Sequence, residues 1–265
     1  METTRSIAQI HDAAGPTDTT EEFNLLHAAL GGLADQMKAR FELTLDPSVE
    51  EFDSYGAPDG PTGSIKAYTG PEVDWMIHSW IGDPAKGFTN LHLTCWLGPH
   101  TWVPHFGMAV GTLPDYWYFV DFVPRKDPLV EADYVDRYYE PDNAQYMEMR
   151  HEPGFSPFVS QNLYVRQAVS HTAMCFVVER SPEHLARMLE LAQGRLDRWF
   201  AHLDAGDPVD PAERAALAAR DLRIRRNVAD RDPANIMGVR YFGEDMTERL
   251  VRALWGGDRV LPRPV

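Results

Sequence analysis

Residues 64–97 read SIKAYTGPEVDWMIHSWIGDPAKGFTNLHLTCWL, and this stretch decides the fold. It holds three runs rich in β-branched and aromatic residues, which is the composition of strands. The links between the runs are too short for crossover helices, so neighbouring strands are expected to run antiparallel. The expected strands cover residues 64–69, 73–81, 90–97 and 117–123, with a weaker candidate over 106–110.

Several of these runs are apolar on both faces. WMIHSWI at 75–81 and YWYFVDF at 116–122 place large apolar side chains on both sides of their strands. A sheet covered by helices on both sides explains this pattern. We expect helices from Thr20 to about Met37, within 131–150, from Pro182 to about Leu203, from Pro211 through an arginine cluster and over 244–255. Two more strands are expected over 163–169 and 173–179.

The predicted fold class is α/β in the mixed, α+β sense: a three-layer α/β/α sandwich with a central, mainly antiparallel sheet flanked by helices. Residues 1–18 are small, polar and aperiodic, and are expected to form a flexible N-terminal arm. Residues 46–62 are rich in Pro, Gly and Asp and are expected to form a long loop. No internal repeat or sharp change of composition follows, so residues 19–265 are expected to form a single domain.

The charge of the chain is acidic but unevenly distributed. The 265 residues hold 25 Lys and Arg against 40 Asp and Glu, a formal net charge of −15. Such a charge repels phosphate backbones and anionic lipids, so neither nucleic acid nor a membrane surface is an expected partner. Residues 1–184 hold 11 Lys and Arg against 27 Asp and Glu, whereas residues 185–265 hold 14 Arg against 13 Asp and Glu. An anionic partner is therefore expected to meet the arginine-rich last third.

Only two cysteines occur, Cys95 and Cys175, so the chain cannot build a disulfide framework or a four-cysteine metal or iron–sulfur site. The N-terminus lacks the apolar core of a secretory signal, and no stretch approaches the roughly 20 apolar residues of a membrane helix. We therefore expect a soluble, cytoplasmic protein. The histidine spacings match no known zinc or two-histidine, one-carboxylate signature, so no metal site is expected.

Motifs for common cofactors are missing from the sequence. It contains no GxGxxG after a strand, no GxxxxGK[ST], no GxSxG and no HExxH. Rossmann dehydrogenases, P-loop enzymes and ordinary α/β-hydrolases are therefore disfavoured. Redox chemistry would need a separate electron donor, because no motif for a bound nicotinamide, flavin or iron–sulfur cluster is present.

His92 is the strongest candidate for a pocket residue. In NLHLTCWL at 90–97 one face of the strand is wholly apolar, whereas His92, Thr94 and Trp96 occupy the other. A mixed polar and aromatic face is typical of a pocket lining, and imidazole exchanges protons near neutral pH. The alternative is a core histidine satisfied by one hydrogen bond. His105 and Trp80 are weaker candidates for the pocket wall, and core packing is the alternative for both.

Asp121 lies inside the apolar run YFVDFVP. An ionised carboxylate is costly there unless it is paired. The expected role is structural, by pairing with Arg125 or by capping a turn.

Five arginines gather in RDLRIRRNVADRDPANIM at 220–237. One interpretation is a solvated helix surface. The other is a docking patch for an acidic partner, because a local basic surface steers association at distances near the Debye length of about 8 Å. The arginines are Arg220, Arg223, Arg225, Arg226 and Arg231.

Five motifs follow one another between about residues 60 and 255: VDWMIHSW, PHFGMAV, VDFVPRKDPLVEADYVDRYYE, FVSQNLYVRQAVSHTA and YFGEDMTERLVRAL. Together they resemble the red chlorophyll catabolite reductase family, a relative of the ferredoxin-dependent bilin reductases. The resemblance is strongest over 122–173. The tail RDPANIMGVRYFGEDMTERLV is similar to the bilin reductases in particular.

The resemblance implies an oxidoreductase that acts on CH–CH groups with ferredoxin as its electron donor. An open-chain tetrapyrrole, or bilin, is then expected between the sheet and the C-terminal helices. Reduced ferredoxin supplies electrons one at a time in a radical mechanism, side chains supply protons, and no flavin or metal is bound in the enzyme. Ferredoxins are acidic, which gives the five arginines a specific partner, and the resemblance makes a homodimer a reasonable expectation.

By the same resemblance, His92 and Asp232 are expected to be catalytic. His92 falls where bilin reductases place an active-site histidine, and Asp232 of RDPA falls where both branches use a carboxylate near the substrate. Arg166 in LYVRQ is expected to bind a substrate carboxylate, since a guanidinium forks onto that group. His105 and Trp80 stay the weaker substrate-binding candidates.

The chain departs from these families at Ala109 in PHFGMAV, where they carry a proton-donating Asp or Glu. A methyl group donates no proton. Two readings follow. Either the protein still reduces a linear tetrapyrrole or a similar conjugated ligand, with Asp232 and His92 supplying protons, or it binds a tetrapyrrole without reducing it or acts on a different small molecule.

Overall fold

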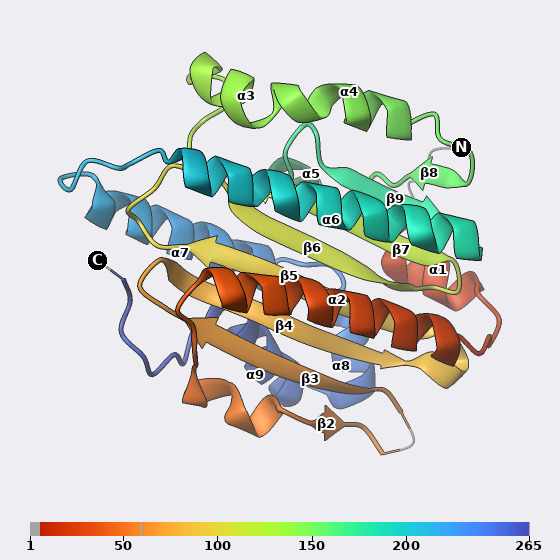
Figure 1. The fold of residues 1–265 in the computed structure, drawn as a ribbon. Helices are drawn as coiled ribbons and strands as arrows, with labels where there is room; N and C mark the ends of the chain where they lie inside the picture. The colour runs from red at the N-terminus through yellow and green to blue at the C-terminus, as the bar shows by residue number, and fades with distance from the viewer. Residues whose placement is uncertain (1–5, 59, 265) are drawn as a thin grey trace.

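The computed structural model describes residues 6–58 and 60–264, which contain a nine-stranded antiparallel sheet (Figure 1). The strand order is β1-β3-β4-β5-β6-β7-β9-β8, and β2 pairs with β3. The long strands from β3 to β7 are neighbours in chain order, because short loops join them as hairpins. The strands are β1 (Thr44–Leu45), β2 (Tyr55–Gly56), β3 (Thr62–Thr69), β4 (Val73–Asp83), β5 (Phe88–Leu97), β6 (His105–Thr112), β7 (Tyr116–Val123), β8 (Phe155–Pro157) and β9 (Met174–Val178).

Helices cover both faces of the sheet. One face is covered by α2 and α6, and the opposite face by α7, α8 and α9 (Figure 1). The predicted α/β/α sandwich with a mainly antiparallel sheet is confirmed. The helices are α1 (Ile7–Ala13), α2 (Thr20–Arg40), α3 (Ala132–Tyr138), α4 (Glu140–Met149), α5 (Leu163–Ala168), α6 (Pro182–Ala205), α7 (Arg214–Asp230), α8 (Asn235–Phe242) and α9 (Glu244–Trp255), with short 3-10 turns at Pro47–Phe52 and Pro84–Lys86.

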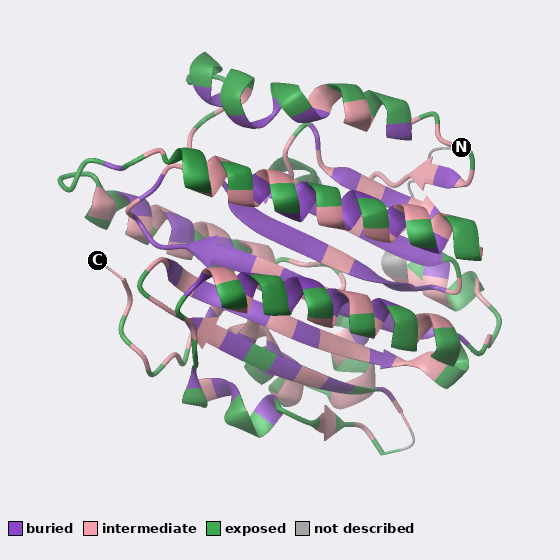
Figure 2. Ribbon diagram, viewed as in Figure 1, coloured by how far each residue is buried: buried purple, intermediate pink, exposed green. Residues whose placement is uncertain are grey.

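The alternation along β5 separates two packed cores. Leu91, Leu93 and Cys95 are fully buried against the α2–α6 layer. On the other face, Trp96 packs in a second cluster with Leu250 of α9. Figure 2 shows the same burial along the central strands, where β6 is buried almost throughout. The sheet is thus an inner layer, as its doubly apolar strands predict.

The segment 163–169 is helical, so its prediction as a strand is wrong. Asn162 caps the helix, because its side-chain oxygen accepts hydrogen bonds from the N–H groups of Tyr164 at 2.9 Å and Val165 at 3.3 Å. Leu163 is exposed and joins no strand ladder. The next predicted strand, at 173–179, is confirmed as β9.

The N-terminal arm contains a helix, α1, which the sequence did not predict. Ser6 and Gln9 form a capping box at its start. Ile10 is buried in a cluster with Phe88 and Trp117, and so ties α1 to the sheet. Residues 1–5 of the predicted arm lie outside the described part of the chain.

A buried charge cluster holds α7 against the sheet. The Asp221 carboxylate accepts two hydrogen bonds from the Arg125 guanidinium, at 2.7 and 3.1 Å. His105 Nε2 lies 3.4 Å from the same carboxylate. Arg125 therefore pairs with Asp221 and not with Asp121, which corrects one of the two roles expected for Asp121.

Candidate functional site

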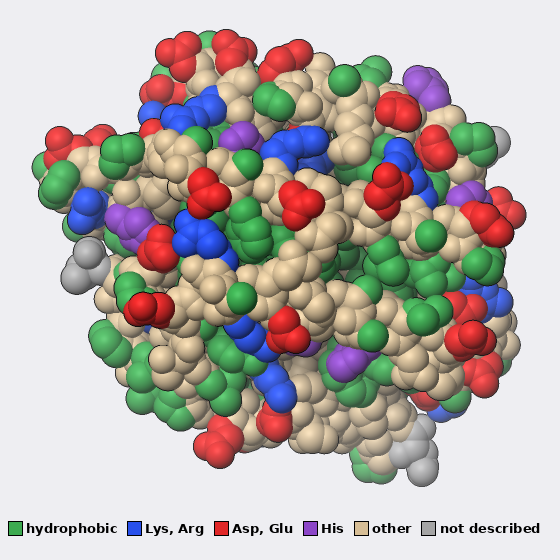
Figure 3. All heavy atoms as spheres, in the orientation of Figure 1, with side chains coloured by type: hydrophobic (Ala, Val, Ile, Leu, Met, Phe, Trp, Pro, Cys, Tyr) green, Lys and Arg blue, Asp and Glu red, His purple; other side chains and the backbone are tan. Residues whose placement is uncertain are grey.

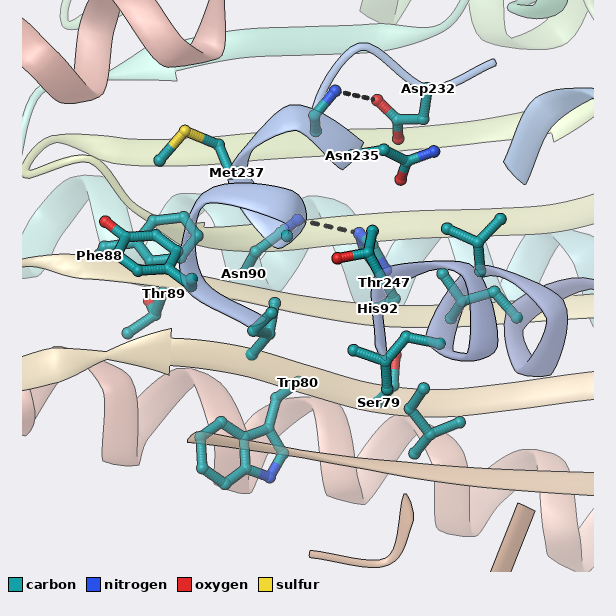
Figure 4. A pocket seen from close by; sticks show the side chains of 18 of the residues that line it. Ser79, Trp80, Phe88, Thr89, Asn90, His92, Asp232, Asn235, Met237 and Thr247 are labelled. Carbon is teal, nitrogen blue, oxygen red and sulfur yellow. Dashed lines mark hydrogen bonds between the residues drawn. The ribbon is translucent and has the colours of Figure 1, made fainter. Parts of the chain in front are cut away.

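A cavity of about 120 Å³ lies between the sheet and the α8–α9 pair. β4 and β5 supply its sheet wall, and α8, α9 and the turn before α8 supply its helix wall. Figure 4 shows side chains from both walls directed toward one another. The polar lining residues are Tyr55, Ser79, Thr89, Asn90, His92, Asp232, Asn235, Tyr241 and Thr247.

His92 stands on the sheet wall of this cavity. In the two neighbouring ladders its Cα partners are Ser79 of β4 and Ala109 of β6. Burial lowers the pKa of His92 to about 4, because the charged imidazole loses its hydration. His92 is therefore neutral at physiological pH. The structure places it on the pocket face of β5, and its catalytic role stays a prediction.

Asp232 stands on the opposite wall, in the turn between α7 and α8. Its side-chain oxygen Oδ1 accepts a hydrogen bond from the Ala234 N–H at 2.8 Å, which fixes the start of α8 (Figure 4). Burial raises the pKa of the Asp232 carboxyl. Asp232 thus keeps its proton to a higher pH than an exposed aspartate, and it faces the same cavity as a neutral imidazole.

Ala109 brings no charge to His92. It lies on β6 as the Cα partner of His92, and it packs with Phe88, Leu113 and Trp117 in an apolar cluster. A carboxylate in this place would stabilise an imidazolium. With a methyl group there instead, burial alone sets the lowered pKa of His92.

A family model described as red chlorophyll catabolite reductase matches residues 27–255. The chain belongs to this family. It is 27% identical to red chlorophyll catabolite reductase 1, chloroplastic, from Oryza sativa subsp. japonica, over 94% of this chain and 83% of that protein. It is 26% identical to red chlorophyll catabolite reductase, chloroplastic, from Arabidopsis thaliana, over 79% of this chain and 71% of that protein. These relatives are reductases, and the resemblance read from the motifs is confirmed.

The fold is also that of a solved bilin reductase. Phytochromobilin synthase from tomato, in complex with biliverdin, matches with a TM-score of 0.71 and 16% identity. The match covers 88% of this chain and 82% of that chain. At this identity the match shows a shared fold.

The side chains of the two weaker candidates for the pocket wall, Trp80 and His105, pack outside the cavity. Trp80 borders the cavity, but its indole packs on Phe23 of α2, with 5.1 Å between ring centroids, so it points to the other face of the sheet (Figure 4). His105 shares the face of His92 but is buried under α7, where its Nδ1 accepts the Leu97 N–H at 3.0 Å. Core packing, the alternative for both, describes their surroundings.

Arg166 lies outside the cavity lining. It is exposed on α5, where its guanidinium donates to the Ser160 carbonyl at 2.7 Å. Two residues earlier, the Tyr164 ring lies 5.5 Å from the Arg231 guanidinium. This contact sets α5 beside the turn that carries Asp232.

Arg225 is not a surface residue, so its prediction as a partner-binding residue is wrong. Its side chain is 3% exposed, and Nη1 pairs with Asp74 at 2.8 Å. It falls on the buried stripe of α7 with Leu217 and Asp221, at helical spacings of four residues. The other four arginines of the cluster, Arg220, Arg223, Arg226 and Arg231, have exposed or half-exposed side chains.

Sequence reasoning missed Asn90, and it named Asp121 without finding its partner. Asn90 lies two residues before His92 and lines the same cavity, and period-two alternation was a signal that could have found it. Asp121 accepts hydrogen bonds from Ser170, which gives Ser170 of the motif at 158–173 a structural role. No sequence signal joins these two residues, because they are 49 positions apart.

The described residues offer neither a cluster of metal ligands nor a helix that could span a membrane. Within 6–58 and 60–264, no group of three or more His, Cys, Asp or Glu side chains is arranged to hold a metal ion. In the same part of the chain, no helix combines the length and the apolar character needed to cross a membrane.

Proposed function

We propose that this member of the family is a ferredoxin-dependent reductase of a carbon–carbon double bond in an open-chain tetrapyrrole. The observation that carries the proposal is the pairing of Asp232, whose pKa is raised, with neutral His92 across one cavity. Titratable groups with perturbed pKa values that line one cavity are typical of a functional site, and here burial favours the protonated carboxyl and the neutral imidazole. The family name and the biliverdin held by the fold relative support the substrate class.

The proposed reaction consumes two electrons and two protons for each double bond. The first electron from ferredoxin turns the conjugated ligand into a radical anion, and the Asp232 carboxyl gives it a proton. A second ferredoxin supplies the second electron. We assign the second proton to a relay through His92: because its ring is neutral, it takes up a proton from solvent as it gives its own N–H proton to the reduced ligand. Solvent also returns a proton to Asp232. The scheme needs no resident cofactor.

The ligand needs more room than the cavity offers. Pockets for small molecules occupy roughly 300–1,000 Å³, against about 120 Å³ here. A second hollow of about 340 Å³ shares the lining residues Phe88, Leu113 and Tyr241 with the first. The Tyr241 hydroxyl lies 3.0 Å from His11 Nε2 of α1. In this proposal, substrate entry moves Tyr241 and joins the two hollows.

Arg166 is retained as the proposed anchor for a substrate carboxylate. The contact between Tyr164 and Arg231 supports this role, because it keeps α5 next to the helix wall of the cavity. The exposed guanidinium is free of any carboxylate partner among the described ion pairs. A propionate that reaches the surface near Asp232 is the group it would bind.

The proposed ferredoxin surface is the exposed side of α7 and α9. The guanidinium groups of Arg226 and Arg252 lie 5.3 and 5.6 Å from the Trp255 ring, so cations surround an aromatic side chain there. Arg226 and Arg252 also pair with Asp230 and Asp258, and acidic and basic side chains are interspersed on the α2–α6 face as well (Figure 3). Three more exposed or half-exposed arginines, Arg220, Arg223 and Arg231, lie on α7 or just after it. An acidic partner is therefore expected on the α7–α9 side.

Charge reversal tests this surface. Arg223→Glu with Arg226→Glu is expected to slow ferredoxin association and to weaken its dependence on salt. Lys38→Glu with Arg187→Glu makes the same change of charge on α2 and α6 and serves as the control. Equal association rates for the two double variants would remove the α7–α9 surface from the proposal.

Anaerobic incubation of the full chain tests the function. The protein is mixed with biliverdin or red chlorophyll catabolite and a system that reduces ferredoxin, and absorbance is followed. A change in the tetrapyrrole spectrum that requires both the protein and ferredoxin supports reduction. Unchanged spectra with both substrates would contradict it.

A second candidate function follows from Ala109, because the usual acid is missing beside His92. The protein would then be a tetrapyrrole-binding protein without reductase activity, or an enzyme for another small molecule. Tight binding of biliverdin without a ferredoxin-dependent spectral change identifies the first, and failure to bind any tetrapyrrole identifies the second.

Two further predictions concern the setting of the protein. The cytoplasmic location stays a prediction, and the rice and Arabidopsis relatives are named chloroplastic. The homodimer also stays a prediction, which sedimentation equilibrium of the full chain tests.

A further inference from the structure

The Asn90 side chain lines the same cavity as His92 and contacts its imidazole ring. Asn90 precedes His92 by two residues on β5, so both side chains lie on one face of the sheet. Both residues line the cavity. The amide nitrogen Nδ2 of Asn90 lies 3.1 Å from His92 Nε2, as the dashed line in Figure 4 marks.

This hydrogen bond decides which ring nitrogen carries the proton. With the Asn90 amide nitrogen facing Nε2, the NH₂ group donates and Nε2 of His92 accepts. Because half-buried His92 is neutral, its ring has a single N–H. The proton is therefore on Nδ1, and Nδ1 is the atom that can donate to a ligand.

The other end of the amide is an unused acceptor. The Asn90 oxygen Oδ1 is buried, and within 6–58 and 60–264 no group donates to it. Buried acceptors of this kind are rare in folded proteins, because an unmade hydrogen bond is destabilising. Ala109, across the ladder from His92, has no polar side-chain atom. Asn90 therefore offers an uncharged acceptor next to the histidine.

We propose that Asn90 is a positioning and specificity residue: Nδ2 holds the His92 proton on Nδ1, and Oδ1 accepts a pyrrole or lactam N–H of the substrate. The proposal rests on the tetrapyrrole function proposed above. Open-chain tetrapyrroles carry such N–H donors along the chain of rings. A neutral amide accepts from a neutral N–H without requiring a cationic ligand, whereas a carboxylate favours a protonated one.

The first test uses the wild-type protein without ligand. Imidazole ¹⁵N chemical shifts are measured in full-length protein labelled at histidine, and His92→Gln identifies the His92 signals. The expected result is a neutral ring protonated on Nδ1 between pH 6 and 8. A proton on Nε2 would overturn the positioning role, because Asn90 would then have to accept through its oxygen.

The second test measures binding of biliverdin by absorbance titration. Asn90→Leu removes the acceptor while keeping the branched outline of the side chain, and is expected to weaken binding roughly tenfold or more. Asn90→Asp keeps an acceptor, so it is expected to bind more tightly than Asn90→Leu, and its carboxylate should raise the pKa of His92 in the ¹⁵N titration. Ser79→Ala is the matched control, because Ser79 lines the same cavity and is a Cα partner of His92.

The outcomes separate this inference from the proposed function. If the wild type binds biliverdin and Asn90→Leu binds it equally well, the acceptor role is overturned while the function stands. If the wild type binds no tetrapyrrole, the function and the acceptor role both fail, and the ¹⁵N experiment still decides the positioning role. Equal losses of biliverdin affinity in Asn90→Leu and Ser79→Ala would mean that Asn90 contributes no more than any other residue lining the cavity. That result would also overturn the proposal.

Discussion

Replacement of Asp121 by asparagine is expected to make stability less dependent on pH. The Asp121 side chain on β7 is fully buried, and it accepts the Ser170 N–H at 2.8 Å and contacts the Ser170 hydroxyl oxygen at 2.5 Å. Burial raises the pKa of Asp121 from 3.8 to about 7. Asparagine has the same shape, and its amide can keep both contacts with Ser170.

The sign follows from the raised pKa. The folded protein holds this proton more tightly than the unfolded chain, so the wild type loses stability as the pH rises from about 4 to about 7. Each pKa unit corresponds to about 1.4 kcal/mol, so the full loss from Asp121 is at most about 4 kcal/mol. Most of it, roughly 2 to 3 kcal/mol, falls between pH 5 and 8. The asparagine side chain does not ionise, so D121N does not lose this part of the unfolding free energy as the pH rises.

Urea unfolding at pH 5, 6, 7 and 8, followed by tryptophan fluorescence, measures the effect. The difference in unfolding free energy between D121N and wild type is expected to shift in favour of D121N by roughly 2 to 3 kcal/mol across this range, with unchanged m-values. Asp115→Asn, an exposed position in the turn between β6 and β7, is the control and is expected to show no such shift. A difference for D121N that is the same at pH 5 and pH 8 would refute the reasoning.

Three further predictions concern the site and its support. Asp232→Asn is expected to lower the rate of tetrapyrrole reduction about 10²- to 10⁴-fold with little change in biliverdin affinity, in stopped-flow absorbance; an unchanged rate would exclude Asp232 as the acid. Ala109→Asp places a carboxylate beside His92 and is expected to raise the pKa of His92 from about 4, as ¹⁵N titration would show, whereas an unmoved pKa would contradict the ladder pairing. Asp221→Ala leaves Arg125 buried without its carboxylate and is expected to cost about 3–5 kcal/mol in urea unfolding; a loss below about 1 kcal/mol would mean that the cluster does not hold α7.

Local sequence patterns predicted those elements whose secondary structure depends mainly on their own residues. The helix over 244–255 is found at those bounds as α9, because its apolar stripe and the preceding Gly243 define it within the segment. The apolar and mixed faces of residues 90–97 are found as predicted on β5. The prediction of a strand at 163–169 was wrong because the apolar composition of this segment is compatible with a strand or a helix. The Asn162 cap favours the helix.

The sequence by itself determined the antiparallel sheet, its two helical layers, the family, and the strand face that carries His92. These depend on side-chain period, link length and ordered motifs, which are local properties of the chain. Only the tertiary structure decided that Trp80 faces α2, that Arg225 is buried against Asp74, and that Asp232 meets His92 across a cavity. The physical reason is that period alone leaves open which side of a doubly apolar strand meets which helix layer. Burial, and with it the pKa of each titratable group, is set by partners far away in the chain.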